Sequence, residues 1–438
     1  MANHCFIVAF VFFAISLFGN QALAESPRQE SVRDRLWIWG HPAGVYNNSY
    51  LKGVTRKSTI QPGAAAKYMG IRNMIFVRYE GQPQPPFEKY YRPFKKLDRV
   101  YWSLVGASGV TSGRERQQVY KLAEGNDNVA GFILDDFFHE SATEDRDLWL
   151  AENNVAFPVT VTITAPPTLV PCDTLKLVQS NWKTGDYRSN DFEIELSSNG
   201  KDFKQVSKGA LPDRAAASVT IAIPNQKFAA LRIRILSTHD TKGAISCGLK
   251  AIELYSAGTK QKLEGAKVAA SSSYSGFHAV SLVGGVVPFR ASLSPKQLQD
   301  LASRKVRGKK LPIMAVVYTG QISRRAKAHL DQVDQVCMWT WRPENLKQLE
   351  TNLTALEKLV RDKPIFLGCY MYDFASGRPL QVEQMKWQTE FGYKWLRQGR
   401  VDGMIFLATP NVDVDLEAVE WTRKWIAKFG DEPLVEDK

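Results

Sequence analysis

The chain has 438 residues, of which 44% are hydrophobic and 11% aromatic, and its formal net charge is +12 at pH 7. The length is enough for two or three domains, and the composition is that of a globular protein rather than a disordered one. The basic excess suits a solvated surface or attraction to an acidic polymer such as a sulfated or uronate polysaccharide. No recognisable nucleic-acid-binding motif occurs, so we expect no nucleic-acid partner.

The N-terminus has the pattern of a secretory signal peptide. A continuous apolar run, "CFIVAFVFFAISLFG", covers residues 5–19, and the small residues "ALA" at 22–24 precede Glu25. The run is short for a membrane span, and small residues at this spacing suit cleavage by a signal peptidase. We therefore expect residues 1–24 to be removed and the protein to be secreted, periplasmic or at the cell surface, with no integral membrane segment after cleavage. An uncleaved anchor is the alternative.

From residue 35, short apolar strands alternate with helices. The alternation breaks after residue 140 and resumes at Ser294, a helix N-cap that is followed by Pro295 at the first helical position. Eight strand–helix units of this kind predict an α/β fold, a (β/α)₈ barrel built from residues 33–140 and 288–430. A doubly wound open sheet is the alternative, but no Gly-rich phosphate turn follows the first strand. The expected strands are 35–42, 72–81, 99–108, 129–138, 311–320, 335–341, 364–374 and 401–410.

Residues 141–287 follow a different pattern. They contain short stretches of period-two hydrophobicity, such as "VTVTIT" and "SVTIAI", divided by Asn-Gly and Pro turns. The span is far too long for a loop, and period-two stretches at this spacing are typical of an all-β sandwich. The sequence therefore predicts a sandwich inserted after the fourth barrel strand.

The insert resembles the discoidin-like family (coagulation-factor type C, a galactose-binding jelly roll). The stretches that carry the resemblance are "DFEIELSSNGKDFKQVSKG" (191–209), "AALRIRIL" (229–236) and "GLKAIELYSAG" (248–258). The family's opening pattern stands at the end of the insert as "KVAASSSYSGFHAVSLVGG" (267–285), with Gly284 in place of an acidic residue. The module is therefore either circularly permuted or followed by a truncated second copy. The resemblance implies a jelly roll that, in many members, binds glycans at the loops of one end.

Four of the five cysteines lie beyond the predicted signal peptide. Cys172 and Cys247 both fall in the insert, and export would permit a disulfide between them, which the sequence leaves open. Cys337 and Cys369 lie in apolar strands, where buried free thiols are expected. No CxxC pair occurs and the histidines are scattered, so we expect neither a metal site nor a cofactor.

The working face of such a barrel is formed by the C-terminal ends of its strands. In this chain those ends are rich in aromatic and carboxylate side chains. Sugars stack on aromatic rings and bind carboxylates and arginine through their hydroxyls, so this set suits a sugar better than a phosphate. Packing in the core is the alternative for any one aromatic residue. The predicted substrate-binding residues are His41, Arg78, Tyr318, Trp339, Trp341 and Tyr372.

Glycoside hydrolysis needs two acids that flank the scissile bond. The stretch "VAGFILDDFFHE" (129–140) ends the fourth strand with Asp135 and Asp136, and Asp373 ends the seventh. This placement resembles the large clan of retaining barrel glycosidases, which holds its acids, mostly Glu, at the ends of these two strands. Side chains alternate along a strand, so only one of the paired acids is expected to face the mouth unless the strand has ended. The predicted catalytic residues are Asp136 as general acid/base, Asp373 as nucleophile or base, Asp135, and Glu80 in reserve.

The sequence therefore predicts an exported glycan-processing protein, a glycoside hydrolase whose sandwich serves as a carbohydrate-binding or lid module. A non-catalytic glycan-binding or cell-surface scaffold protein is the alternative from another class. Metal-dependent hydrolysis is a third reading, because Asp135, Asp136, His139 and Glu140 offer oxygen and nitrogen ligands. Matching ligands at a fixed spacing elsewhere are missing, which disfavours the metal.

Overall fold

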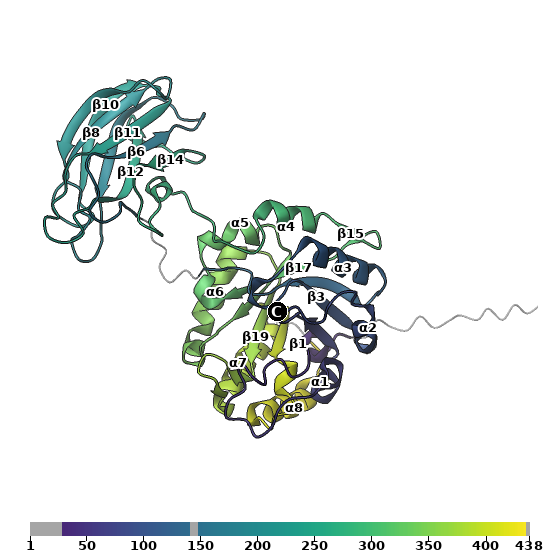
Figure 1. The fold of residues 1–438 in the computed structure, drawn as a ribbon. Helices are drawn as coiled ribbons and strands as arrows, with labels where there is room; N and C mark the ends of the chain where they lie inside the picture. The colour runs from purple at the N-terminus through teal and green to yellow at the C-terminus, as the bar shows by residue number, and fades with distance from the viewer. Residues whose placement is uncertain (1–28, 141–147, 435–438) are drawn as a thin grey trace, which may run out of the picture.

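The computed structural model describes residues 29–140 and 148–434, so the predicted signal peptide lies outside the described residues. Eight parallel strands close into a barrel (Figure 1). In their order around the barrel they are β1 (Leu36–Gly40), β2 (Asn73–Phe76), β3 (Arg99–Val105), β4 (Val129–Leu134), β17 (Ile313–Tyr318), β18 (Gln335–Trp339), β19 (Ile365–Tyr370) and β22 (Gly403–Leu407). The predicted closed barrel is confirmed, and the open sheet is wrong.

Each barrel strand is followed along the chain by a helix. The α4 helix begins where the sequence predicts, since the Ser294 hydroxyl accepts a hydrogen bond from the Gln297 backbone N–H at 3.3 Å. The α2 helix is short because Pro93 cannot donate a backbone hydrogen bond, and the chain continues as a 3₁₀ turn. The helices are α1 (Pro62–Met69), α2 (Glu88–Tyr91), α3 (Gly113–Glu124), α4 (Pro295–Ala302), α5 (Lys327–Leu330), α6 (Leu349–Val360), α7 (Val382–Arg397) and α8 (Glu417–Phe429).

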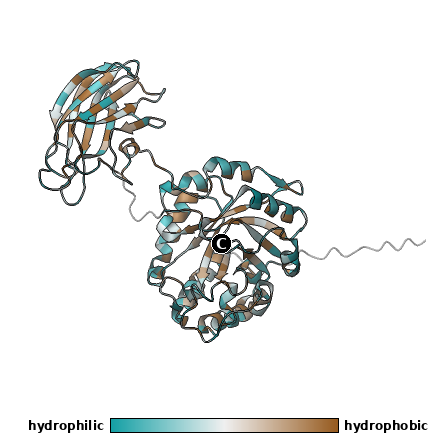
Figure 2. Cartoon of the chain, in the orientation of Figure 1, coloured by the Kyte–Doolittle hydropathy of each residue, from teal (hydrophilic) through white to brown (hydrophobic). Residues whose placement is uncertain are grey.

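The barrel interior is packed with large apolar side chains. The strands are largely hydrophobic in Figure 2, and every residue of β1, β2, β19 and β22 is buried. Trp37 lies edge-on to Tyr101 and to Phe366, at ring-centroid distances of 5.0 and 6.1 Å. Gly368 makes room for the Trp339 ring, because a Cβ at this position would lie 2.2 Å from that ring. The barrel is therefore a filled core, and its chemistry must lie at its rim.

The insert forms two antiparallel sheets beside the barrel (Figure 1). One sheet contains β10 (Ser218–Gln226), β7 (Cys172–Gln179), β12 (Gly248–Ser256), β13 (Thr259–Lys260) and β5 (Trp149–Leu150). The other contains β14 (Lys267–Ala270), β6 (Val159–Thr164), β11 (Ala230–Ile235), β8 (Asp191–Ser197) and β9 (Lys204–Ala210). Their apolar faces share one core, as the predicted sandwich requires. Cys172 and Cys247 are both buried in it as free thiols, so the disulfide that export would permit is not formed.

The chain leaves and re-enters the barrel at neighbouring points. Phe138 and Ala291 form an antiparallel bridge, and the His139 N–H donates to the Arg290 carbonyl at 2.9 Å. The Ser292 N–H donates in turn to the carbonyl of Phe137 at 3.0 Å. The two connections to the sandwich therefore pair with each other at the barrel surface.

Short hairpins complete the fold, formed by β15 (Lys305–Val306) with β16 (Lys309–Lys310) and by β20 (Tyr372–Asp373) with β21 (Arg378–Pro379). Across residues 29–140 and 148–434, no helix is both long and apolar enough to cross a lipid bilayer.

Candidate active site

A cavity of about 590 Å³ opens at the C-terminal ends of the barrel strands. All eight strands, or the segments that follow them, contribute to its wall. The lining residues are Trp39, His41, Tyr46, Tyr50, Tyr79, Ala107, Asp135, Asp136, Tyr318, Thr319, Gly320, Gln321, Trp339, Trp341, Arg342, Asn345, Tyr370, Phe374 and Leu407.

Both acids of the "DD" pair reach this cavity. The β4 strand ends at Leu134, although the Asp135 N–H still bonds to the Val105 carbonyl at 3.1 Å. Asp136 then adopts a left-handed conformation, with φ of 42°, which breaks the strict alternation of side chains along a strand. The strand has therefore ended where both acids can face the mouth, which is the exception that the sequence analysis left open.

Asp136 is held by two hydrogen-bond donors. Its Oδ1 accepts from the Tyr318 hydroxyl at 2.7 Å, and its Oδ2 accepts from the Ser108 backbone N–H at 2.8 Å. Ser108 is itself in the left-handed region, with φ of 58°, so the loop after β3 turns its N–H toward the acid. Donors at both oxygens therefore fix the orientation of this carboxyl group in the cavity wall.

Asp135 has a different environment. It is only 6% exposed, and burial, followed by the nearby charge of Asp136, raises its pKa well above the ordinary value. A backbone N–H from Asp136 opposes the shift but does not cancel it. The two neighbouring carboxyls are thus distinguished: burial favours the protonated form of Asp135, whereas Asp136 is held by a hydrogen-bond donor at each of its oxygens.

Tyrosines form much of the remaining wall. Burial is the first cause that raises the pKa values of Tyr46, Tyr318 and Tyr370 well above 10.0, and the charge of Asp135 adds to the shift of all three. These phenols therefore stay protonated and act as hydrogen-bond donors toward the acids or a ligand.

His41 and Trp39 are fixed against each other. The indole N–H of Trp39 donates to His41 Nε2 at 3.0 Å, and His41 Nδ1 lies 2.9 Å from the Val77 carbonyl. Burial lowers the pKa of His41 from 6.5 to about 4. Thus His41, a predicted sugar-binding residue, lines the cavity as a neutral imidazole.

Two tryptophans play different parts in the wall. Trp339 is 1% exposed and lies on the floor, with ring centroids 5.3 Å from Trp39 and 5.0 Å from Tyr370. Trp341 is 39% exposed, with Tyr318 standing edge-on to it at 6.1 Å. An exposed ring beside a cavity is a surface on which a sugar can stack, whereas the buried ring shapes the floor.

Two predicted residues from the second strand do not line the cavity. The Arg78 guanidinium is buried beneath the rim, where it donates to the Pro83 and Gly81 carbonyls and pairs with Glu115 at 2.9 Å. Glu80 is exposed in the turn that follows, with φ of 46°. Arg78 thus shapes a loop, and Glu80 is oriented by a turn rather than by the strand.

The two predicted residues from the seventh strand also lie outside the cavity. The β19 strand ends at Tyr370, and the next residues form the β20–β21 hairpin, which has its own hydrogen bonds. Asp373 accepts from the Ser376 N–H at 3.0 Å and pairs with Arg378 at 3.2 Å. The Tyr372 hydroxyl is 2.9 Å from the Lys52 N–H and accepts from it. The expectation that Asp373 faces Asp136 across the mouth is therefore not met.

Several residues that line the cavity were not predicted from the sequence. Tyr46 and Tyr50 come from the long loop after β1, and Tyr79 lies between Arg78 and Glu80, the two residues that were predicted after β2. Phe374 was passed over in favour of its neighbours, although it is aromatic. The signal for the loop tyrosines was their clustering in "GVYNNSY" (44–50), which strand counting does not consider.

No metal-binding arrangement occurs within the described part of the chain, judged by groups of three or more His, Cys, Asp and Glu. His139 contacts the Ser292 hydroxyl at 3.0 Å. Glu140 forms ion pairs with Arg290 at 2.7 Å and Arg325 at 2.6 Å. The ligand set that the sequence offered is thus divided among other partners.

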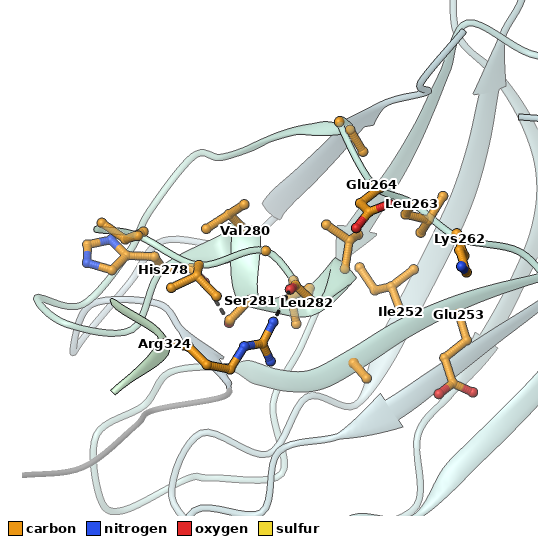
Figure 3. A pocket seen from close by; sticks show the side chains of 18 of the residues that line it. Ile252, Glu253, Lys262, Leu263, Glu264, His278, Val280, Ser281, Leu282 and Arg324 are labelled. Atoms are coloured by element: carbon orange, nitrogen blue, oxygen red, sulfur yellow. Dashed lines mark hydrogen bonds between the residues drawn. The ribbon is translucent and has the colours of Figure 1, made fainter. Parts of the chain in front are cut away.

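A second cavity, of about 930 Å³, lies where the sandwich meets the loop after β17 (Figure 3). Arg324 reaches it from the barrel and donates to the Gly284 carbonyl at 3.4 Å. Its one acid with strong contacts, Glu253, bonds to Lys260 and lies 3.8 Å from Lys176.

The sandwich also has an aromatic cluster in its loops, formed by Trp182, Tyr187, Tyr274 and Phe277. Trp182 stands edge-on to Phe277 at 5.2 Å, and Tyr274, which is 39% exposed, lies 6.4 Å from Tyr187. The loop between β7 and β8 and the segment after β14 supply these rings. Tyr274 and the half-buried Trp182 can therefore form a second sugar-binding surface, with the buried Tyr187 and Phe277 packed behind them.

No family model and no curated protein matches the chain. The solved structures similar to it include three carbohydrate-binding modules, each matching 23–28% of the chain. One is CpGH89CBM32-5 from Clostridium perfringens, in complex with GalNAc-beta-1,3-galactose (13% identity, 84% of that chain, TM-score 0.21). The others are the CBM32 of AlyQ in complex with 4,5-unsaturated mannuronic acid (15%, 93%, 0.21) and the family 32 module of Streptococcus pneumoniae EndoD (11%, 72%, 0.20). TM-scores this low establish neither fold nor ligand, so the sandwich is defined here by its own strand pairing.

Proposed function

We propose that the barrel is a glycoside hydrolase that acts on a sugar bound in the mouth cavity. The observation that carries this proposal is the pair Asp135 and Asp136 on the wall of a cavity lined by aromatic rings. Rings bind the apolar faces of a sugar, and a carboxyl pair in two protonation states supplies the acid and the charge that glycosidic cleavage needs.

The surroundings of the two acids suggest their roles. Asp135, whose burial raises its pKa, is the general acid that protonates the departing oxygen. Asp136, which accepts hydrogen bonds from Tyr318 and Ser108, is the ionised carboxylate that stabilises positive charge at the reacting sugar. This assignment departs from the sequence analysis, which favoured Asp136 as the acid and paired it with Asp373.

We also propose that the sandwich binds glycans, through the loop rings Trp182, Tyr187, Tyr274 and Phe277. The resemblance to discoidin-like modules supports this role, as do the exposed Tyr274 ring and the half-buried Trp182 ring, which pack on the buried Tyr187 and Phe277. The net charge of +12 supports an acidic glycan among the ligands. Export to an extracytoplasmic compartment, where such polymers occur, remains part of the proposal.

The test is to incubate the purified protein with a panel of polysaccharides and oligosaccharides and to measure the release of reducing ends. Asp135→Asn and Asp136→Asn should each abolish release. Asp127→Asn is the matched control, because Asp127 precedes the opposite end of the same strand and its side chain is 97% exposed. Circular dichroism of each variant must show that the barrel is folded.

A non-catalytic glycan-binding scaffold is the competing function, favoured by the loop rings of the sandwich. If glycans bind to the wild-type protein and to both acid variants with equal affinity, and none is cleaved, the scaffold function is correct and the hydrolase is wrong. A Trp182→Ala variant that loses this binding would then locate it on the sandwich.

A further inference from the structure

The mouth cavity has a general acid but no protein nucleophile opposite it. Among the described residues that line the cavity, Asp135 and Asp136 are the only carboxylic acids, and they are adjacent in the chain. Two-carboxylate hydrolysis needs the second group on the other side of the sugar, either to attack C1 or to activate a water. Asp373, which could have served, is bonded within the β20–β21 hairpin.

The tyrosines are poor substitutes for that missing group. A nucleophilic tyrosine must give up its proton, but burial and the nearby acids keep Tyr46, Tyr318 and Tyr370 protonated. The Tyr318 hydroxyl is also engaged, because it donates to Asp136 at 2.7 Å. A phenolate beside this carboxylate would place two negative charges in a buried site.

We propose that the substrate supplies the nucleophile itself, as a 2-acetamido group on a 2-acetamido-2-deoxy sugar in 1,2-trans glycosidic linkage. This inference rests on the proposed hydrolase function and names its substrate class. In the first step, the acetamido carbonyl oxygen attacks C1 and forms a C1–O bond. The bond from C1 to the leaving oxygen breaks, and Asp135 transfers its proton to that oxygen.

Asp136 has the position and charge to assist this step. As the carbonyl oxygen attacks, positive charge spreads over the amide, whose N–H then becomes a strong donor. Asp136 accepts two hydrogen bonds from the protein, and an ionised carboxylate has about four acceptor positions, so it can also take the amide N–H. It thereby orients the amide and stabilises the bicyclic oxazolinium ion that forms.

The second step restores both the enzyme and the amide. Water attacks C1 of the oxazolinium ion, and Asp135, now ionised, takes a proton from that water. The bond from C1 to the amide oxygen breaks, which regenerates the acetamido group on a free sugar. The aromatic rings of Trp39, Trp339 and Tyr370 form the floor of the cavity. They suit the acetamido methyl group, because a methyl group needs no hydrogen-bond partner and packs against aromatic rings.

The first experiment compares 4-nitrophenyl β-glycosides of N-acetylglucosamine and N-acetylgalactosamine with those of glucose and galactose. We expect cleavage of an acetamido glycoside only. Replacing its N-acetyl by N-trifluoroacetyl should reduce kcat by about 10²-fold, because fluorine weakens the attacking oxygen. The thiazoline derived from the preferred sugar mimics the bicyclic ion and should bind about 10²-fold or more tightly than the parent sugar.

The leaving group separates the roles of the two acids. Asp135→Asn should slow cleavage of a poor leaving group far more than cleavage of 2,4-dinitrophenol, which needs no proton. Asp136→Asn should slow both substrates to the same extent and should also weaken thiazoline binding. Asp127→Asn should change neither rate nor binding.

The opposing results are distinct. One result would overturn the acetamido mechanism but not the hydrolase function. It is cleavage of glucosides or galactosides, together with a covalent adduct on a carboxylate or tyrosine after incubation with a 2-deoxy-2-fluoroglycoside, as detected by intact-protein mass spectrometry. If no member of either glycoside series is cleaved and the thiazoline does not bind, both the mechanism and the proposed hydrolase are wrong for this cavity.

Discussion

His41 should remain neutral in the folded protein far below the pH at which a free histidine is protonated. With its Nδ1–H toward the Val77 carbonyl and its Nε2 accepting from Trp39, both nitrogens are satisfied only in the neutral ring. A proton on Nε2 would point at the indole N–H, and the ring is only 3% exposed, so water cannot replace the lost bond. Burial accordingly lowers the pKa from 6.5 to about 4.

This shift fixes the sign and size of a pH effect on stability. The unfolded chain takes up the proton near pH 6.5, whereas the folded protein takes it up only near pH 4. The contribution of His41 to stability is therefore fully present above pH 6.5 and is lost as the pH falls toward 4. At about 1.4 kcal/mol per pH unit, the interval corresponds to about 3 kcal/mol of unfolding free energy.

Two measurements check this expectation. NMR of the histidine rings, with the His41 signal assigned by its absence in His41→Gln, should show no titration of that ring between pH 8 and pH 5. Urea unfolding at a series of pH values should show a steeper loss of stability below pH 6.5 in the wild type than in His41→Gln. A His41 ring that titrates near pH 6.5 would refute the burial and hydrogen-bond reasoning.

Three further variants test other parts of the mouth. Asp135→Asn should raise the free energy of unfolding at pH 7. The carboxyl has a higher pKa in the folded protein than in the unfolded chain, so the stability that it contributes is lost as the pH rises from 3.8 toward the folded pKa, and asparagine has no such loss. Equal stability of the variant and the wild type at pH 7 would contradict this expectation. Tyr318→Phe should cost about 1.5–3 kcal/mol in urea unfolding, because its hydroxyl donates to a carboxylate. It should cost more than Tyr101→Phe, whose hydroxyl donates to the neutral Gln335 amide oxygen at 3.0 Å, and an equal cost would be inconsistent with a charged Asp136. Asp373→Asn should lower the thermal unfolding midpoint through loss of its ion pair, and an unchanged midpoint would show that the hairpin does not depend on it.

The architecture could be predicted because its signals are local and repeated. An apolar run such as Ile365–Tyr370 is what a strand buried on both faces requires. The Ser294–Pro295 pair marks the start of a helix, because the serine accepts a hydrogen bond from the first turn and the proline suits the first helical position. Eight such units leave few topologies, and the change to period-two patterning reveals the insert. Short helices such as Lys327–Leu330 are harder to delimit from a sequence, because one turn of helix has too few residues to show a periodic pattern.

The site was predicted only in part, because its geometry depends on where each strand ends. Asp135 and Asp136 both reach the cavity since one residue adopts a positive φ, which no periodicity reveals. Asp373 misses it because β19 stops at Tyr370 and a hairpin begins two residues later. Arg78 was expected at the rim but is bonded beneath it to Glu115, a helix residue distant in sequence. Strand counting finds the correct rim but cannot find the direction of each side chain.

The pairing of Phe138 with Ala291 has a consequence for how this protein could have been assembled and could be shortened. Because the chain departs and returns at adjacent hydrogen-bonded positions, a tight turn between residues 140 and 290 would replace the whole sandwich with an ordinary strand-to-helix connection. Closing so short a loop costs little entropy, and the barrel keeps all eight of its strands. The barrel without its sandwich should fold alone. Comparing its turnover of small and polymeric glycans with that of the full-length protein would separate the contribution of the barrel from that of the sandwich.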